Sequence, residues 1–336
     1  MVPPGSRQAL SAGPNESSSG YGENTLGEIA ESDPVFLPDL ATIFARRAER
    51  LLTLAGGHEL ESFLRLIGAV VAAQHQALAG LPPGRLPGPA QIDKAKLAKR
   101  APLDPSTWER DESWQMALKR IVESVDDAVL PAQARVARAA LRAMDATRLE
   151  ALADAFLVGD VAAEDAAHTV FVAAALQVSW TRMAALLGKA GLSADTAETG
   201  QCPVCGSPPL AGMISPGGTK FGHRHLHCSL CATAWRYVRV RCVHCGGTDK
   251  ISSRNLAGTS YLRAECCESC HGYSKVFYIE KARSLEPLAD DLASLGLDLL
   301  VAEEGFARAP NPFVLGMSSR PAVEVSAAAR PSNQPR

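Results

Sequence analysis

Four Cys-x-x-Cys pairs constrain this chain of 336 residues more than any other feature. The pairs are Cys202/Cys205, Cys228/Cys231, Cys242/Cys245 and Cys267/Cys270, and one further thiol, Cys266, stands outside the pattern. One such pair places two sulfurs on a tight turn, and two turns brought together by a hairpin complete a tetrahedron around a metal ion. The spacing therefore predicts two tetrathiolate sites of the zinc-ribbon or rubredoxin type.

Sequential pairing of these turns is favoured over interleaved pairing, because the intervals Cys205–Cys228 and Cys245–Cys267 are nearly equal. Gly206 and Gly246 each follow a pair directly, where a residue that tolerates positive φ lets backbone N–H groups turn toward the sulfurs. Sequential pairing predicts a first site from the first two pairs and a second site from the last two. The alternative, unliganded cysteines packed as small hydrophobic side chains, does not explain the spacing.

The chain is therefore predicted to bind two metal ions, but sulfur-only tetrahedra accept zinc and iron alike. Zinc would brace the fold, whereas iron would make each site a one-electron centre. Each tetrathiolate with a divalent ion carries a charge near −2, which Arg236, Arg239 and Arg241 could offset.

Several other residues are weaker candidates. His223, His225 and His227 alternate on one predicted strand and could form a further ligand set, but the tetrathiolates are complete without them. His244 and His271 are predicted to lie beside the sites or in solvent. Cys266 adjoins Cys267 and cannot readily join the same tetrahedron, so it is either a redundant or a reactive thiol. His168 and Trp180 are predicted to belong to a core.

The rest of the pattern predicts a multidomain α+β protein. Residues 1–33 are rich in Gly, Ser and Pro and are predicted to be disordered. Residues 34–197 show apolar spacings of three and four, which predict an all-helical domain around a buried helix at 162–188. The predicted remainder comprises a first four-cysteine metal ribbon at 198–241, a second at 242–282, both β modules in tandem, a C-terminal helix at 283–309, and a mostly disordered tail at 310–336.

Composition indicates the cellular compartment and the class of partner. We find neither a signal peptide nor an apolar run long enough to span a bilayer, and nine cysteines arranged mostly as pairs suit metal binding in a reducing cytoplasm. The net charge of −2 does not indicate a polyanion partner. Between Gln201 and Lys281, however, ten Lys or Arg residues stand against four Asp or Glu, so a nucleic-acid-binding ribbon is one alternative.

Motifs in all three regions, in order, resemble the family of the formate dehydrogenase accessory protein FdhE. The helical region contributes Phe44-Ala45-Arg46-Arg47-Ala48 with Leu51, Leu54 and His58, and Val170–Val178 through Trp180-Thr181-Arg182. The ribbons contribute Cys202–Ser207, Leu226–Cys231, Ala264-Glu265, and Cys270 with Tyr273 and Lys275, and the C-terminal region contributes Ala302–Gly305 and Asn311-Pro312-Phe313. One departure is Ala234 in Thr233-Ala234-Trp235, where the family pattern has a glutamate, so no role of that carboxylate is carried over.

The resemblance implies a cytoplasmic, non-enzymatic maturation factor that contacts the catalytic subunit of formate dehydrogenase, with rubredoxin-type metal sites. Carried over by position, the metal ligands are Cys202, Cys205, Cys228 and Cys231, and Cys242, Cys245, Cys267 and Cys270. The sequence shows no nucleotide-binding loop, catalytic triad or paired-acid signature. A rubredoxin-like electron-transfer protein is the other alternative, and the sequence leaves open whether the chain forms a homo-oligomer.

Overall fold

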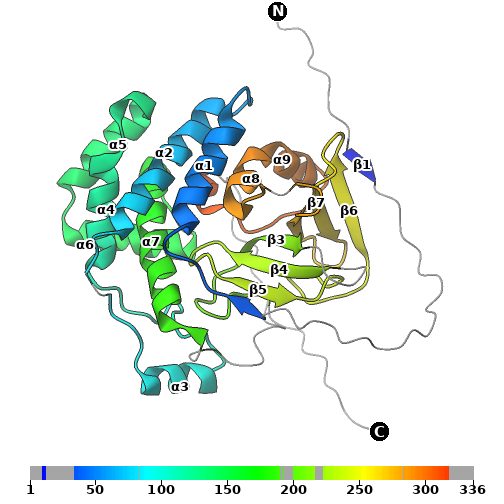
Figure 1. Cartoon of the computed structure of the whole chain (residues 1–336), viewed down its shortest axis with the longest axis horizontal. Helices are drawn as coiled ribbons and strands as arrows, with labels where there is room; N and C mark the ends of the chain where they lie inside the picture. Colours follow the sequence, from blue (N-terminus) through cyan, green and yellow to red (C-terminus); the bar gives the residue numbers. More distant parts are fainter. Residues whose placement is uncertain are drawn as a thin grey trace, which may run out of the picture.

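Helices gather on one side of the molecule and a sheet on the other, with two short helices between them (Figure 1). The computed structural model describes residues 10–12, 34–82, 84–189, 192, 200–215, 222–282 and 284–317. The disordered segments predicted at 1–33 and 310–336 therefore lie largely outside the described residues. The predicted fold class is confirmed: a helical N-terminal region precedes a sheet that carries both cysteine clusters.

The helical region follows the predicted apolar spacings closely. Its helices are α1 (Ile43–Ala55), α2 (Glu61–Leu78), α3 (Pro89–Leu97), α4 (Ser113–Ser124), α5 (Ala132–Ala143), α6 (Ala146–Val158) and α7 (Thr169–Leu187). Short 3-10 turns lie at Asp127–Val129 and Ala163–His168. Helix α3 was not predicted, because it buries none of its residues and so lacks the apolar stripe by which the others are recognised.

Helix α7 is the central core helix, as its sequence predicts. Residues 171–181 are all buried, and the Trp180 indole donates to the Leu103 carbonyl at 2.9 Å. The stretch Ala163–Leu187 has the length and apolar character of a membrane span, yet 72% of its most apolar window is buried inside the protein. Its position is therefore that of a core helix packed among α2, α4 and α6.

The sheet has eight strands in the order β1-β6-β7-β8-β3-β4-β5-β2. The strands are β1 (Leu10–Ala12), β2 (Val35–Phe36), β3 (Pro209–Ser215), β4 (His223–Cys228), β5 (Ala234–Tyr237), β6 (Ile251–Leu256), β7 (Leu262–Cys267) and β8 (Tyr273–Tyr278). Strands β3, β4 and β5 form one antiparallel ribbon, and β6, β7 and β8 form the other.

The two ribbons join through a parallel pairing of β3 with β8, which aligns Met213 with Phe277. Neighbouring side-chain patterns do not specify such a pairing, and the sequence analysis did not foresee it. At the other edge, β2 from the start of the helical region pairs with β5. The prediction of an all-helical N-terminal region missed β2, because two residues are too few for a periodic pattern.

The predicted C-terminal helical segment is present but divided. Helix α8 (Pro287–Ala293) ends at Ser294, and α9 (Leu295–Glu303) follows, with a 3-10 turn at Pro312–Met317. Helix α9 buries Leu297 and Val301, whereas Leu299 is 69% exposed. Helix α8 packs between α1 and β3, so it connects the helical region to the sheet (Figure 1).

One apolar core runs from the helices into the first ribbon. It contains Phe44, Trp114 and Trp180 together with Trp235, Leu226 and the first four cysteines. A smaller core, centred on Tyr273, Phe277 and Leu297, lies between the second ribbon and α9. The predicted domain limits at 197/198, 241/242 and 282/283 stay predictions, because apolar packing continues across the first of them.

Candidate metal centres

The four cysteine turns share one backbone geometry. In each, the amide of the first cysteine donates to the carbonyl five residues later, at 2.8–3.0 Å. These donors and acceptors are Cys202 to Ser207, Cys228 to Thr233, Cys242 to Gly247 and Cys267 to Gly272. Each turn therefore holds its two thiols toward the same point, as metal-binding turns require.

Positive φ follows every pair. Gly206 and Gly246 have φ of 73° and 74°, which confirms the positive φ expected at these glycines. The corresponding positions of the other two turns hold Ala232 at 57° and His271 at 55°. Non-glycine residues rarely adopt this conformation, so the tertiary structure must compensate for backbone strain at these two turns.

The first site consists of Cys202, Cys205, Cys228 and Cys231, whose Sγ atoms all lie within 4.8 Å of one another. The Sγ–Sγ distance is 3.5 Å between Cys202 and Cys231 and 3.4 Å between Cys205 and Cys228. All four side chains are buried. The amides of Leu230 and Cys231 both donate to the Cys228 sulfur at 3.3 Å.

The second site consists of Cys242, Cys245, Cys267 and Cys270, within the same limit of 4.8 Å. Its Sγ–Sγ distances are 3.7 Å for Cys242–Cys270 and 3.8 Å for Cys245–Cys267. The His244 amide donates to the Cys242 sulfur at 3.4 Å. Unlike the first site it is open, because Cys245 is exposed and Cys270 is half-buried.

Both clusters fit one tetrahedral ion each. A tetrahedron with metal–sulfur distances of ~2.3 Å has sulfur–sulfur edges of ~3.8 Å, which the second site matches and the first approaches. The structure groups the pairs sequentially, and among the described residues both candidate metal clusters consist of cysteine alone. Sulfur-only donors suit zinc or iron, so the geometry leaves that choice open.

The thiols of the first cluster differ in pKa. Burial raises the pKa of Cys202 and Cys228 well above the usual range of a thiol. The pKa of Cys205 lies well below that range despite its burial, because Cys202, Cys228 and Cys231 hydrogen-bond to its sulfur. A cation must displace the remaining thiol protons, so metal binding should weaken in acid.

The predicted histidine strand exists, but its histidines take other roles. His225 is buried against Phe36, with ring centroids 5.2 Å apart. Burial, aided by His225 and Arg47, lowers the pKa of His227 to about 3, so its ring is neutral. Neither these two histidines nor His223 joins a candidate metal cluster among the residues described.

Cys266 lies outside both clusters. Its side chain is fully buried in the smaller core, and burial raises its pKa to about 12. A thiol with such a pKa holds almost no thiolate at neutral pH and reacts poorly. Of the two interpretations from the sequence, this environment favours the redundant thiol.

Of the three arginines predicted to offset the thiolate charge, Arg241 contacts a cysteine turn: its Nε donates to the Gly246 carbonyl at 3.0 Å. A further arginine, Arg224, was not predicted as a functional residue, and it is fully buried. Its Nη1 donates to the Glu265 carboxylate at 2.8 Å and so links β4 to β7. This ion pair joins the two ribbons on either side of the parallel pairing.

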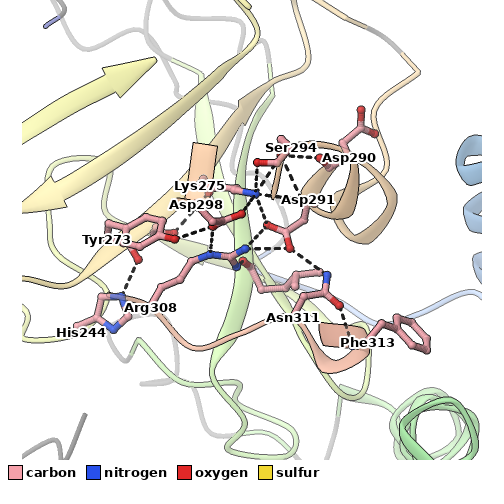
Figure 2. A network of polar contacts seen from close by, with 12 residues as sticks. His244, Tyr273, Lys275, Asp290, Asp291, Ser294, Asp298, Arg308, Asn311 and Phe313 are labelled. Carbon is pink, nitrogen blue, oxygen red and sulfur yellow. Dashed lines mark hydrogen bonds and ion pairs between the residues drawn. The ribbon is translucent and has the colours of Figure 1, made fainter. Parts of the chain in front are cut away.

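Buried charges lie between the second ribbon and helices α8 and α9 (Figure 2). The fully buried Lys275 ammonium contacts the carboxylates of Asp298 and Asp291, the latter at 3.3 Å. It also donates to the carbonyls of Asp291 and Ser294 at 2.9 and 3.0 Å. Arg308 bridges the same carboxylates, at 2.7 Å to Asp298 and 2.8 Å to Asp291. Two cations therefore balance two anions.

This network extends in both directions (Figure 2). The Tyr273 hydroxyl donates to Asp298 at 2.6 Å, and the Tyr273 carbonyl lies 2.9 Å from the His244 ring nitrogen, inside a turn of the second site. On the other side, Asn311 donates to Asp291 at 2.9 Å and accepts from the Phe313 amide at 3.1 Å. Because Phe313 belongs to the main core, polar contacts connect the second site to the helical region.

Comparison with known proteins gives one consistent result. Three family models match in order: the FdhE N-terminal domain over residues 32–196, the FdhE central domain over 201–239, and the FdhE C-terminal domain over 240–315. A protein FdhE homolog of Pseudomonas aeruginosa is 41% identical over 280 residues, which cover 80% of this chain and 89% of that protein. Protein FdhE of Shigella boydii is 36% identical over 286 residues, covering 84% and 91%.

A solved structure agrees. The crystal structure of the FdhE protein from Pseudomonas aeruginosa superimposes with a TM-score of 0.75 at 36% identity, covering 84% of this chain and 98% of that one. The similarity thus includes the helical region, both ribbons and the C-terminal helices.

Proposed function

Because the chain belongs to the FdhE family, we propose that it is a cytoplasmic, non-enzymatic maturation factor required for formate dehydrogenase activity. In this proposal the protein binds the catalytic subunit of formate dehydrogenase directly. It holds two metal ions, iron or zinc, on Cys202, Cys205, Cys228 and Cys231, and on Cys242, Cys245, Cys267 and Cys270.

The observation that carries this proposal is the match to all three family models together with two clusters that fit tetrahedral ions. The metals have a structural reason in this fold. In each ribbon, strands begin or end at the cysteine turns. An ion that joins two turns therefore fixes the strand ends of that ribbon. A surface built on these ribbons would be presented to a client only while the sites are filled.

A nucleic-acid-binding ribbon is less well supported than the sequence suggested. Three of the ten basic residues in this segment are held in ion pairs: Lys275 and Arg224 are buried, and the partly exposed Arg254 pairs with Glu304 at 2.7 Å. Cations that are committed to carboxylates inside the protein release no counterions from a phosphate backbone. A gel shift with duplex and single-stranded probes that persists at physiological salt would support this alternative.

Electron transfer is favoured by one observation, the solvent exposure of Cys245 in the second site. An exposed iron–thiolate centre would exchange electrons with a docked redox partner. If so, iron-loaded protein should show a reversible visible absorbance change on reduction with dithionite and reoxidation, whereas the maturation role alone does not require it.

Gene deletion tests the main proposal. Loss of this protein should abolish formate dehydrogenase activity while the catalytic subunit is still synthesised, as measured by activity staining and immunoblotting in the same extracts. Full activity in the deletion strain would refute the maturation role. Tagged protein should also capture the catalytic subunit from extract, and purified components should reproduce that binding.

Cysteine substitutions distinguish the proposed metal ligands from Cys266, which lies outside both clusters. Cys228→Ser removes a ligand of the first site and should weaken capture of the catalytic subunit, with metal content falling toward one ion per chain. Cys266→Ala is the matched control, because this buried thiol lies outside both clusters and alanine keeps its position apolar. Equal damage from the two substitutions would contradict the ligand assignment.

A further inference from the structure

The two cysteine clusters differ sharply in solvent access. In the first, no cysteine is more than 4% exposed, and all four belong to the main apolar core. In the second, Cys245 is exposed and Cys270 is half-buried, while Cys242 and Cys267 face inward. The clusters have the same ligands and nearly the same turns, so the difference comes from what covers them.

The helical region covers the first site. The Leu103 amide donates to the Val204 carbonyl at 3.0 Å, inside the first cysteine turn. The Gln177 side chain, from the buried helix α7, donates to the Ser229 carbonyl at 2.8 Å, inside the second turn. To expose these sulfurs, the contacts with the helical region must break, which requires opening part of the main core.

At the second site, hydrogen bonds anchor the turns but leave the Cys245 side chain exposed. The Tyr237 hydroxyl donates to the Cys242 carbonyl at 2.9 Å, and Arg241 fixes the Gly246 carbonyl. These contacts hold the inner half of the turn in place while the Cys245 sulfur stays at the surface. Because the Cys245 side chain is exposed, a molecule can reach it without unfolding the ribbon.

We infer that the two centres are functionally unequal: the first is a permanent structural centre, and the second exchanges its metal with external soft ligands, namely thiolates. The inference rests on the proposed binding of two metal ions. Cys245 would give up its place as a ligand to an incoming thiolate, one metal–sulfur bond forming as the other breaks, and the released Cys245 thiolate would take a proton from water. Such an exchange would involve no change of oxidation state and would need no oxidant or reductant.

Metal-release kinetics test this inequality on the full chain loaded with zinc. With an excess of the chromophoric chelator 4-(2-pyridylazo)resorcinol, one equivalent should be released quickly and the other at least about tenfold more slowly, since its release requires local unfolding. Added glutathione should accelerate the fast phase and leave the slow phase unchanged. A single phase of two equivalents, or equal acceleration of both phases, would overturn the inference.

Two further measurements assign the phases. Cys270→Ser should abolish the fast phase, and Cys231→Ser, the matched substitution in the first site, should abolish the slow one. Because Cys231→Ser endangers folding, pulsed alkylation of wild-type protein provides an independent assignment: N-ethylmaleimide should label Cys245 and Cys270 before any first-site cysteine. First labelling at the first site would refute the inference. A starting content well below two ions refutes the metal-binding proposal itself.

Discussion

Replacement of Lys275 by methionine tests whether the buried charge network stabilises the junction between the second ribbon and the C-terminal helices. The Lys275 side chain is fully buried, and its ammonium is shared by two carboxylates and two carbonyls, from Asp291, Ser294 and Asp298. Methionine fills a similar volume, but it leaves these acceptors without their shared donor. Removing one partner of a buried ion pair costs ~3–5 kcal/mol, because the other charge stays buried.

That loss is a large fraction of a typical unfolding free energy of ~5–15 kcal/mol. Urea unfolding followed by far-UV circular dichroism and tryptophan fluorescence should therefore show a clear shift of the midpoint. Arg65→Met is the matched control: Arg65 pairs with Glu61 on the surface of α2, with 51% and 42% of the two side chains exposed. Its loss should cost no more than ~0.5 kcal/mol.

The double variant Lys275→Met/Asp298→Asn sharpens the test. Lys275→Met leaves the Asp298 carboxylate buried without this partner, and Asp298→Asn removes that charge. The double variant should therefore recover part of the lost stability. A loss below ~1 kcal/mol for Lys275→Met would refute the argument that the network is a major stabilising element. So would a double variant less stable than either single one.

Three further predictions concern pH and the cysteine turns. Although burial opposes it, Lys275 and Arg308 lower the pKa of Asp298 from 3.8 to about 2. Its contribution of ~2 kcal/mol should be complete above pH ~5 and be lost progressively as pH falls through ~2, measured by urea unfolding across this range. Gln177→Ala leaves a carbonyl in the second cysteine turn unsatisfied, and should cost ~1–2 kcal/mol and accelerate the slow phase of zinc release. Gly206→Ala should destabilise the protein by ~1 kcal/mol, because alanine is strained at the positive φ of this position. Ala232→Gly should be neutral or slightly stabilising, and thermal unfolding measures both variants.

The sequence was most informative where the determining contacts are local. A Cys-x-x-Cys turn is closed by its own backbone hydrogen bonds, so spacing alone identified the turns and their sequential grouping. The helices that bury an apolar stripe were predicted for the same reason, since a period of 3.6 residues can be recognised within a short segment. Ala232 and His271 were missed because their positive φ is imposed by the turn and not by residue type.

Contacts between distant segments could not be predicted from local sequence patterns. The predicted single C-terminal helix ends at Ser294 because the Lys275 ammonium, from a strand, binds the Asp291 and Ser294 carbonyls at the C-terminal end of α8. A positive charge is favourable there, since it faces the negative end of the helix dipole. Likewise, the parallel pairing of β3 with β8 and the unequal burial of the two sites depend on how whole segments pack. The resemblance to a family did mark Tyr273, Lys275 and Asn311, but only the structure shows that they meet.

The position of this network bears on how the second site and the helical region influence each other. The polar contacts run from His244, in a turn of the second site, through Tyr273 and Asp298 to Arg308, and on by Asp291 to the C-terminal segment that packs on α7. Its members are buried ion pairs and hydrogen bonds, which tolerate little displacement because each group that loses its partner stays desolvated. A change at the second site that moves His244 would therefore strain the junction with α8 and α9. The site with an exposed cysteine is thus linked to the helical region through a buried network of charges, whereas the first site is embedded in that region's core.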